Sequence, residues 1–237
     1  MTLFLASVPV TIQAQSNDAS STERARIPRK GSYFGTLEIK PQPQWDFGYV
    51  PIDYRLVYKF ILENTGDDTL QITKTESTCE CTRAKARELI SPGDTASLVI
   101  TFDTKNFYGP QNRGVIVHSS DKLAPKQMAT FRAVIGGHPE QADMRPRSVF
   151  FLPGQTVDTV KIRNYSEDDL NYSLVYYDSS LFSVTSADWS VDAQEYGEVI
   201  VTANERQSKG AYYACFTLEF DTDPPTRIST PVKIIRY

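Results

Sequence analysis

The chain has 237 residues, of which 40% are hydrophobic and 23% charged, and its formal net charge is -4. This composition is typical of a globular protein, and the negative charge argues against non-specific binding to nucleic acid, so we expect no nucleic-acid partner. Its 12 Phe and 13 Tyr favour β-strands, and its 14 Pro and 12 Gly favour turns between them.

The first 14 residues predict an export signal. An apolar run from Leu3 to Ile12 leads into Gln13 and Ala14, which gives the spacing of a signal-peptidase site after Ala14. The run is too short to span a bilayer, so we expect no stable membrane insertion. No Lys or Arg precedes it, so the positive start of a signal is missing and the signal could be truncated. Residues 15–32 are polar and predict a flexible tether. The export signal places the mature protein in the periplasm or outside the cell.

The rest of the chain alternates apolar and polar residues with a period of two, which predicts β-strands. Between Tyr54 and Leu62 every second side chain is apolar, and Arg55, Lys59 and Glu63 occupy the other face. The segments SLVITF (97–102) and CFTLEF (215–220) alternate in the same way. Turn sequences such as NTGDD and SPGD separate the strands, and together these features predict an all-β sandwich fold.

An internal repeat predicts how this fold is divided. FILENTGDDTL (60–70) aligns without gaps with VKIRNYSEDDL (160–170), which pairs Asn64 with Asn164. Two copies of about a hundred residues each match the size of an immunoglobulin-like sandwich. The segment IGGHPEQADMRP (135–146) separates them. We therefore predict two tandem immunoglobulin-like β-sandwich domains, at residues 33–137 and 138–237.

The first copy resembles a known family. WDFGYV, KFILENTGDDTLQI, STCECT, LISPGDTASLVITFDT and FYGPQNRGVIV follow one another between residues 45 and 117. In this order and spacing they resemble the bacterial domain of unknown function 1573 family over about residues 43–135. The resemblance implies an immunoglobulin-like fold close to PapD and ASH domains, in exported proteins common in Bacteroidota-like bacteria, and it implies no catalytic residues. Glu80 stands where the family usually has Gly, in Cys-Gly-Cys-Thr.

Cys79 and Cys81 are the main candidates for chemistry. In a regular strand their Cα atoms would lie at the long edge of disulfide geometry, so a bridge would need a bulge or a tight turn. Structural zinc needs four ligands, which this chain does not offer at one place, so we expect no cofactor. Two thiolates can hold Cu(I), so a metal at this pair is a minority hypothesis, as is a redox pair. The interpretation that we favour is a structural pair: two small side chains that pack near one end of a sandwich, with a local covalent constraint left open.

The third cysteine, Cys215, alternates away from Phe216, Leu218 and Phe220. It is therefore predicted on the outer face of its strand, half covered by neighbouring tyrosines. A possible exposed thiol at Cys215 could pair between chains.

The aromatic residues offer a further lead. Flat aromatic faces could form a sugar-stacking surface, which makes a glycan a possible ligand. Because the same side chains alternate as packed strands do, we expect most of them in the core. Tyr172, Leu174 and Tyr176 are predicted to share one face, Trp45 and Trp189 to be buried, and Tyr177 to be exposed.

No other motif predicts catalysis. The sequence shows no nucleophile elbow, no paired His ligands and no phosphate-binding Gly loop. His118 is predicted on a solvated strand face and His138 in the linker. We therefore expect a non-enzymatic exported protein of the bacterial envelope or exterior, with a protein partner or a structural role. The alternatives are a carbohydrate-binding accessory module and a thiol- or copper-handling protein that uses Cys79 and Cys81.

Overall fold

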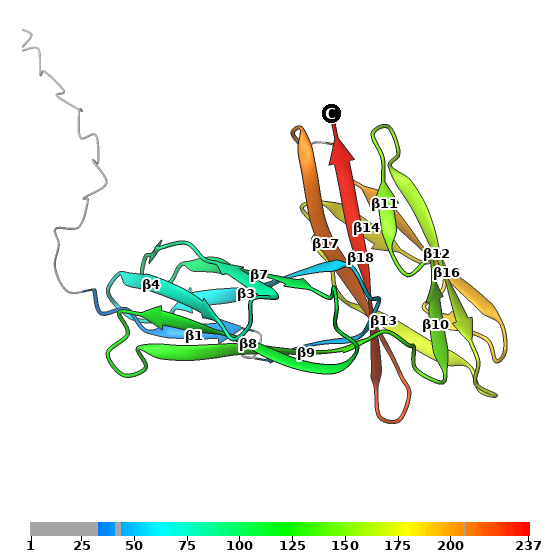
Figure 1. The fold of residues 1–237 in the computed structure, drawn as a ribbon, viewed down its shortest axis with the longest axis horizontal. Helices are drawn as coiled ribbons and strands as arrows, with labels where there is room; N and C mark the ends of the chain where they lie inside the picture. Colours follow the sequence, from blue (N-terminus) through cyan, green and yellow to red (C-terminus); the bar gives the residue numbers. More distant parts are fainter. Residues whose placement is uncertain (1–32, 41–43, 206) are drawn as a thin grey trace, which may run out of the picture. The chain divides into compact units, whose positions relative to one another are not determined.

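The structure is a computed structural model that describes residues 33–40, 44–205 and 207–237. The predicted signal and tether, residues 1–32, lie outside the described residues. All regular elements of the described part are β-strands, 18 in number, which confirms the all-β class (Figure 1). In this part of the chain no helix is long and apolar enough to cross a membrane.

The strands between residues 37 and 135 form two layers. One layer is an antiparallel sheet of four strands in the order β1 (Leu37–Lys40), β3 (Arg55–Asn64), β7 (Thr95–Asp103) and β5 (Thr82–Lys85). The other layer has the order β2 (Gln44–Val50), β9 (Lys126–Ile135), β8 (Gly109–Ser119), β4 (Leu70–Ser77) and β6 (Leu89–Ile90). In this layer β2 runs parallel to β9.

The strands from residue 142 onward repeat this order. The antiparallel four-stranded sheet has the order β10 (Ala142–Arg145), β12 (Val157–Asn164), β16 (Tyr196–Ala203) and β14 (Phe182–Thr185). The opposite layer has the order β18 (Thr226–Arg236), β17 (Gly210–Phe220), β13 (Leu170–Tyr176) and β15 (Ser190–Val191). Strand β11 (Val149–Phe151) runs parallel to β18, as β2 does to β9. The predicted domain boundary between residues 137 and 138 stays a prediction.

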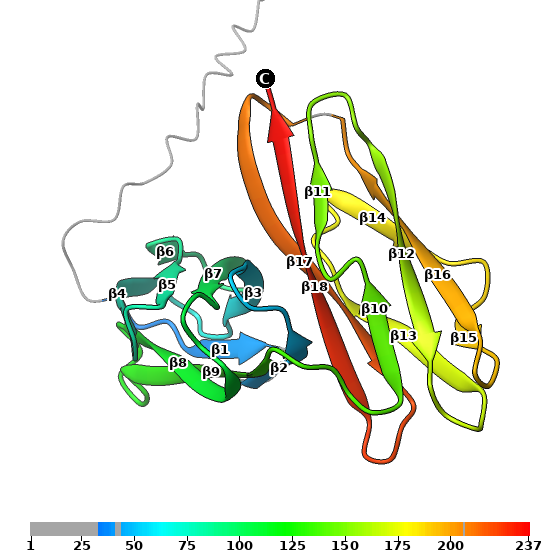
Figure 2. The same cartoon turned by 45° about the vertical axis from the view of Figure 1, so that its right-hand side comes forward.

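A single sheet connects the two sets of strands. Strand β18 pairs with β2 at Ile228 and Tyr49 (Figure 2). This pairing joins the layer that contains β2 and the layer that contains β18 into one sheet of ten strands. Gly48, next to this point, has a φ of +63°, and a Cβ added there would lie 2.0 Å from the carbonyl oxygen of Arg227. The pairing of β18 with β2 therefore requires glycine at position 48, both for the positive φ and for the close approach of the backbone of Arg227.

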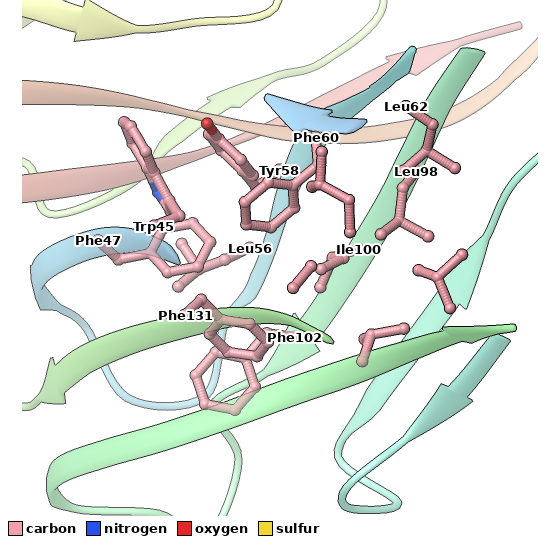
Figure 3. Close-up of a cluster of buried hydrophobic side chains, with 14 of the residues drawn as sticks. Trp45, Phe47, Leu56, Tyr58, Phe60, Leu62, Leu98, Ile100, Phe102 and Phe131 are labelled. Atoms are coloured by element: carbon pink, nitrogen blue, oxygen red, sulfur yellow. The ribbon is translucent and has the colours of Figure 1, made fainter. Parts of the chain in front are cut away.

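Two apolar clusters fill the space between the layers. Figure 3 shows the first, in which the ring of Trp45 stacks on that of Tyr58 with centroids 4.2 Å apart. The second cluster lies among β10 to β18 and contains fully buried Phe182, Phe216 and Phe220. Burial of these large side chains supplies the main favourable free energy of folding.

The repeated asparagines have the same structural role in both halves. The side-chain amides of Asn64 and Asn164 are fully buried and donate to the carbonyl oxygens of Asp68 and Asp168 respectively, each at 2.8 Å. Each amide also donates to a carbonyl of the short strand that follows, that of Ile90 in the first half. The sequence repeat thus marks a hairpin whose polar backbone groups are satisfied by an internal side chain.

Candidate functional site

Cys79 and Cys81 form a disulfide, with their Cα atoms 5.3 Å apart. Residues 78–81 make a turn between β4 and β5 instead of continuing the strand, which brings the Cα atoms within disulfide range. The structure thus shows a covalent bridge, which the packing interpretation leaves open as a local constraint. Both cysteines are half-buried, and Glu80 between them is exposed.

The hydroxyl of Thr82 lies beside both sulfur atoms. Its Oγ1 is 3.4 Å from Sγ of Cys79 and 3.8 Å from Sγ of Cys81. Thr82 itself is buried, and its N–H donates to the carbonyl of Cys79 at 3.3 Å. The N–H of Asp103 in β7 donates to the carbonyl of Cys81 at 3.0 Å. The turn is therefore anchored to β7, and this anchoring also holds Thr82 and its hydroxyl in place.

The bridge closes a loop of only three residues. The chain-entropy relation gives roughly 1.6 kcal/mol of stabilisation for such a loop, against about 3 kcal/mol for one of 15 residues. The bridge is therefore a weak constraint on the unfolded chain.

A hollow of about 430 Å³ opens beside the disulfide, and Cys81 is part of its lining. The lining also includes Arg55, Arg83, Glu80 and Asp103. Two positive and two negative charges balance, so the hollow has no net charge.

The minority hypothesis of a metal at Cys79 and Cys81 requires thiolates, and a disulfide has none, so it would apply only to a reduced protein. Among the described residues, no group of three or more His, Cys, Asp or Glu side chains is arranged to hold a metal ion.

The prediction for Cys215 as a half-covered or exposed thiol is wrong. Its side chain is fully buried, and Sγ donates to the carbonyl of Val57 at 3.2 Å. The alternation of β17 is as predicted, but its second face packs against β3 of the first half and not against water. Burial raises the pKa of the Cys215 thiol to about 12, so this thiol is inert and cannot pair between folded chains.

Polar contacts join β3 of the first half to the end of β13 and the residues that follow it. Nζ of Lys59 lies 2.6 Å from Oδ2 of buried Asp178, and the N–H of Lys59 donates to the hydroxyl of Tyr176 at 3.2 Å. Burial by itself would raise the pKa of Asp178, but the hydrogen bonds from Lys59 and Ser180 lower it overall. The carboxylate is therefore held in its charged form at the junction.

A second set of polar contacts joins β18 to β2. Ser229 Oγ donates to the carbonyl of Phe47 at 2.6 Å and lies 2.7 Å from the hydroxyl of Thr217. The guanidinium of Arg227 lies 5.0 Å from the ring of Trp45.

The prediction that Tyr172, Leu174 and Tyr176 share one face is wrong for Tyr176. A register shift between Leu174 and Tyr176 in β13 reverses the alternation. Tyr172 and Leu174 therefore pack in the second cluster, while Val175 and Tyr176 pack against the first. A bulge of this kind re-aims one side chain, and here it sends Tyr176 across the junction.

The remaining predicted aromatics divide between core and surface. Trp45 is buried and Tyr177 is exposed, as predicted, but Trp189 is 39% exposed and not buried. Trp189 precedes the short strand β15 and covers Tyr172 from outside, with ring centroids 5.5 Å apart. Tyr54, expected on the core face of β3, lies before the first residue of that strand and is 40% exposed.

The two histidines lie apart from the disulfide. His118 is half-buried in β8, and its Nε2 lies 2.8 Å from Oε2 of Glu76. His138 is exposed in the connection between β9 and β10, and its Nδ1 lies 2.7 Å from the carbonyl oxygen of Pro139. Neither histidine has a nucleophile among these contacts.

A larger hollow, of about 480 Å³, lies between the loops that flank β3 and β7 and the strands β11, β17 and β18. Tyr54 and Phe150 in its lining are 40% and 44% exposed. Arg55 lies 4.6 Å from the ring of Tyr213, and Lys233 lies 5.1 Å from the ring of Phe150. Sequence reasoning missed this surface, because it forms only where the two halves meet.

Comparison with known proteins agrees with the sequence resemblance. Residues 37–135 match the family described as protein of unknown function DUF1573. No curated protein matches the sequence.

Several solved structures are similar at low identity. A protein of unknown function from Porphyromonas gingivalis W83 is 10% identical, with a TM-score of 0.35, and the match covers 84% of this chain and all of that one. The ASH / PapD-like domain 7 of human CEP192 is 18% identical, with a TM-score of 0.31, and covers 43% of this chain and 92% of its own. Because these scores lie below 0.5, the description of the fold rests on the sheets themselves.

Proposed function

On the premise that residues 37–135 are a DUF1573 domain, we propose that this chain is an exported, non-enzymatic protein of two tandem immunoglobulin-like domains that binds a protein partner. The partner would be met in the periplasm or outside the cell, where the signal predicted in residues 1–14 directs the chain. If the partner is itself an envelope protein, this function is a structural role in the bacterial envelope.

The observation that carries the proposal is the hollow of about 480 Å³ at the junction of the halves. Its exposed Tyr54 and Phe150 lie beside Arg55 and Lys233. Aromatic and Arg side chains are enriched in protein interfaces, where they supply large contact areas together with hydrogen bonds. The hydroxyl of Ser148 donates to that of Tyr54 at 2.8 Å and joins two walls of the hollow, which favours a preorganised surface.

The test is to capture the partner by cross-linking in the native envelope, with the wild-type protein and two variants used as bait. Phe150→Glu places a charge inside the hollow, and Leu123→Glu places the same charge at a side chain that is 94% exposed outside it. We expect one partner to be captured by the wild type and by Leu123→Glu, and lost with Phe150→Glu. Equal capture by the two variants, or no captured partner, would contradict the proposal.

A carbohydrate-binding module is the second candidate function, and one surface favours it. Tyr196, 66% exposed, lines a hollow of about 360 Å³ together with the carboxylates of Asp188, Glu195 and Glu198. A flat aromatic face beside hydrogen-bond acceptors suits sugar rings and their hydroxyl groups. Glycan-array binding that disappears with Tyr196→Ala would support this candidate, and an array without any bound glycan would exclude it.

A further inference from the structure

The Cys79–Cys81 disulfide has features that a purely structural bridge does not need. It lies in a turn, with both cysteines half-buried, and Cys81 lines a hollow of about 430 Å³. A small thiol or a cysteine on an extended polypeptide can therefore approach Cys81 from the side of the hollow. Access of this kind is the first requirement for thiol–disulfide exchange.

The second feature is the position of the Thr82 hydroxyl. Oγ1 of this buried residue is closer to Sγ of Cys79, at 3.4 Å, than to Sγ of Cys81, at 3.8 Å. A hydroxyl group donates a hydrogen bond to a thiolate more strongly than to a disulfide sulfur, because the thiolate carries a full negative charge. Cys81 lines the hollow and Cys79 does not, so the nearer sulfur to this donor belongs to the cysteine that would leave when Cys81 is attacked.

We propose that this disulfide is a thiol–disulfide exchange site, in which Cys81 accepts the attack of a substrate thiol and Cys79 leaves as a thiolate held by Thr82. This inference goes beyond partner binding and does not depend on it. The substrate class is a dithiol, either a small molecule or two cysteines of another protein.

The exchange balances in two steps. A substrate thiolate attacks Sγ of Cys81, a new S–S bond forms between them, and the Cys79–Cys81 bond breaks with its electron pair on Sγ of Cys79. The second substrate thiolate then attacks the substrate sulfur of the mixed disulfide and displaces Cys81 as a thiolate. The protein gains two electrons and, after protonation of both thiolates, two protons, and the dithiol leaves as a disulfide.

The charged residues of the hollow decide whether the site would select thiols by their charge. Arg55 and Arg83 are balanced by Glu80 and Asp103, so the lining offers no net attraction to anionic or cationic thiols. We therefore expect neutral dithiothreitol and anionic glutathione to react according to their own thiol chemistry, without added charge selection.

The experiment uses the full protein, reduced with dithiothreitol or equilibrated with mixtures of glutathione and glutathione disulfide. Samples are quenched in acid, and free thiols are alkylated and counted by mass. We expect two thiols to appear in glutathione mixtures in which structural disulfides stay oxidised. A bridge that stays fully oxidised across the series would overturn the proposal.

Two variants test the role of Thr82. Thr82→Val keeps the shape and removes the hydroxyl, and Thr82→Ser keeps the hydroxyl. We expect the rate of reduction to fall about tenfold in Thr82→Val, since one hydrogen bond to a charged group is lost, and to be nearly unchanged in Thr82→Ser. Equal rates in wild type and Thr82→Val would refute the assigned role.

The wild type alone tests which sulfur is attacked, whether or not Thr82→Val folds. When the monothiol glutathione is the reductant, the mixed disulfide trapped by the acid quench is mapped by fragmentation. We expect glutathione on Cys81, and glutathione found mainly on Cys79 would overturn the assignment.

Discussion

Replacement of Lys59 by Met tests the ion pair at the junction of the two halves. Met keeps the apolar stem of Lys and removes the ammonium, so the carboxylate of Asp178, 8% exposed, loses a partner at 2.6 Å. Removal of one partner of a buried ion pair costs about 3 to 5 kcal/mol. The side chain of Lys59 is 35% exposed, and Ser180 still donates to Asp178 through both its N–H and its hydroxyl. We therefore expect a loss of about 2 to 3 kcal/mol in the free energy of unfolding.

Urea unfolding measures this loss, from the shift in midpoint at a constant slope. The matched control is Lys40→Met, because Lys40 is also a strand lysine in an ion pair, 2.5 Å from Glu63, but at a more exposed site. Exposed pairs contribute little, so the control should shift the midpoint far less. The double variant Lys59→Met with Asp178→Asn should be more stable than the sum of the single changes predicts. If Lys59→Met unfolds at the same urea concentration as the control, the account of the junction is wrong.

Three further predictions follow from the same structure. The pKa of Asp178 is lowered in the folded state, so its stabilising contribution is present above the unfolded pKa and is lost as the pH falls through the folded one. Unfolding free energies measured from neutral pH down through the Asp range should therefore decrease less for Lys59→Met than for the wild type. Gly48→Ala should cost about 3 kcal/mol or more, from a positive φ and from overlap with the backbone of Arg227, and a melting temperature within about 2 °C of wild type would contradict this. Cys215, whose pKa is raised to about 12, should react with a thiol reagent only at the rate of unfolding, and fast labelling of the native protein would contradict its burial.

Local patterns in the sequence predict the strands and the repeat well, because alternation reports directly which side chains face a core. Leu56, Tyr58, Phe60 and Leu62 are all buried as the alternation of β3 requires. The alignment of Asn64 with Asn164 marks it as an equivalent position in the two halves. Its role in closing a hairpin is visible only in its hydrogen bonds.

The failures of prediction arise where two elements distant in sequence meet. The prediction for Cys215 is wrong because alternation identifies two faces of a strand but does not indicate that a second core covers the outer one. The prediction for Tyr176 is wrong because a single-residue bulge leaves no distinct signal in the letters YSLVYY. The pairing of Lys59 with Asp178 spans more than a hundred residues, and nothing near either residue predicts it.

The disulfide was harder to predict for another reason. Two cysteines separated by one residue can be bridged only if the backbone turns there, and STCECT contains neither Gly nor Pro to indicate a turn. The role proposed for Thr82 could have been suspected, because a hydroxyl residue directly follows Cys81. Its distances from the two sulfurs required the structure.

The ten-stranded sheet determines how the chain would respond to proteolysis. A cut in the connection near His138 would leave two pieces held together only by non-covalent contacts, and their separation would expose an edge and a face on each. The fragment with β17 and β18 would present Cys215, Thr217 and Ser229 to water, all of which are now buried. The fragment with β2 and β3 would lose the cover that Tyr176 and Arg227 give to Trp45. Separated pieces would also carry unpaired strand edges, and such edges promote aggregation. Because separation exposes this buried surface, a nicked chain should hold together until it is denatured.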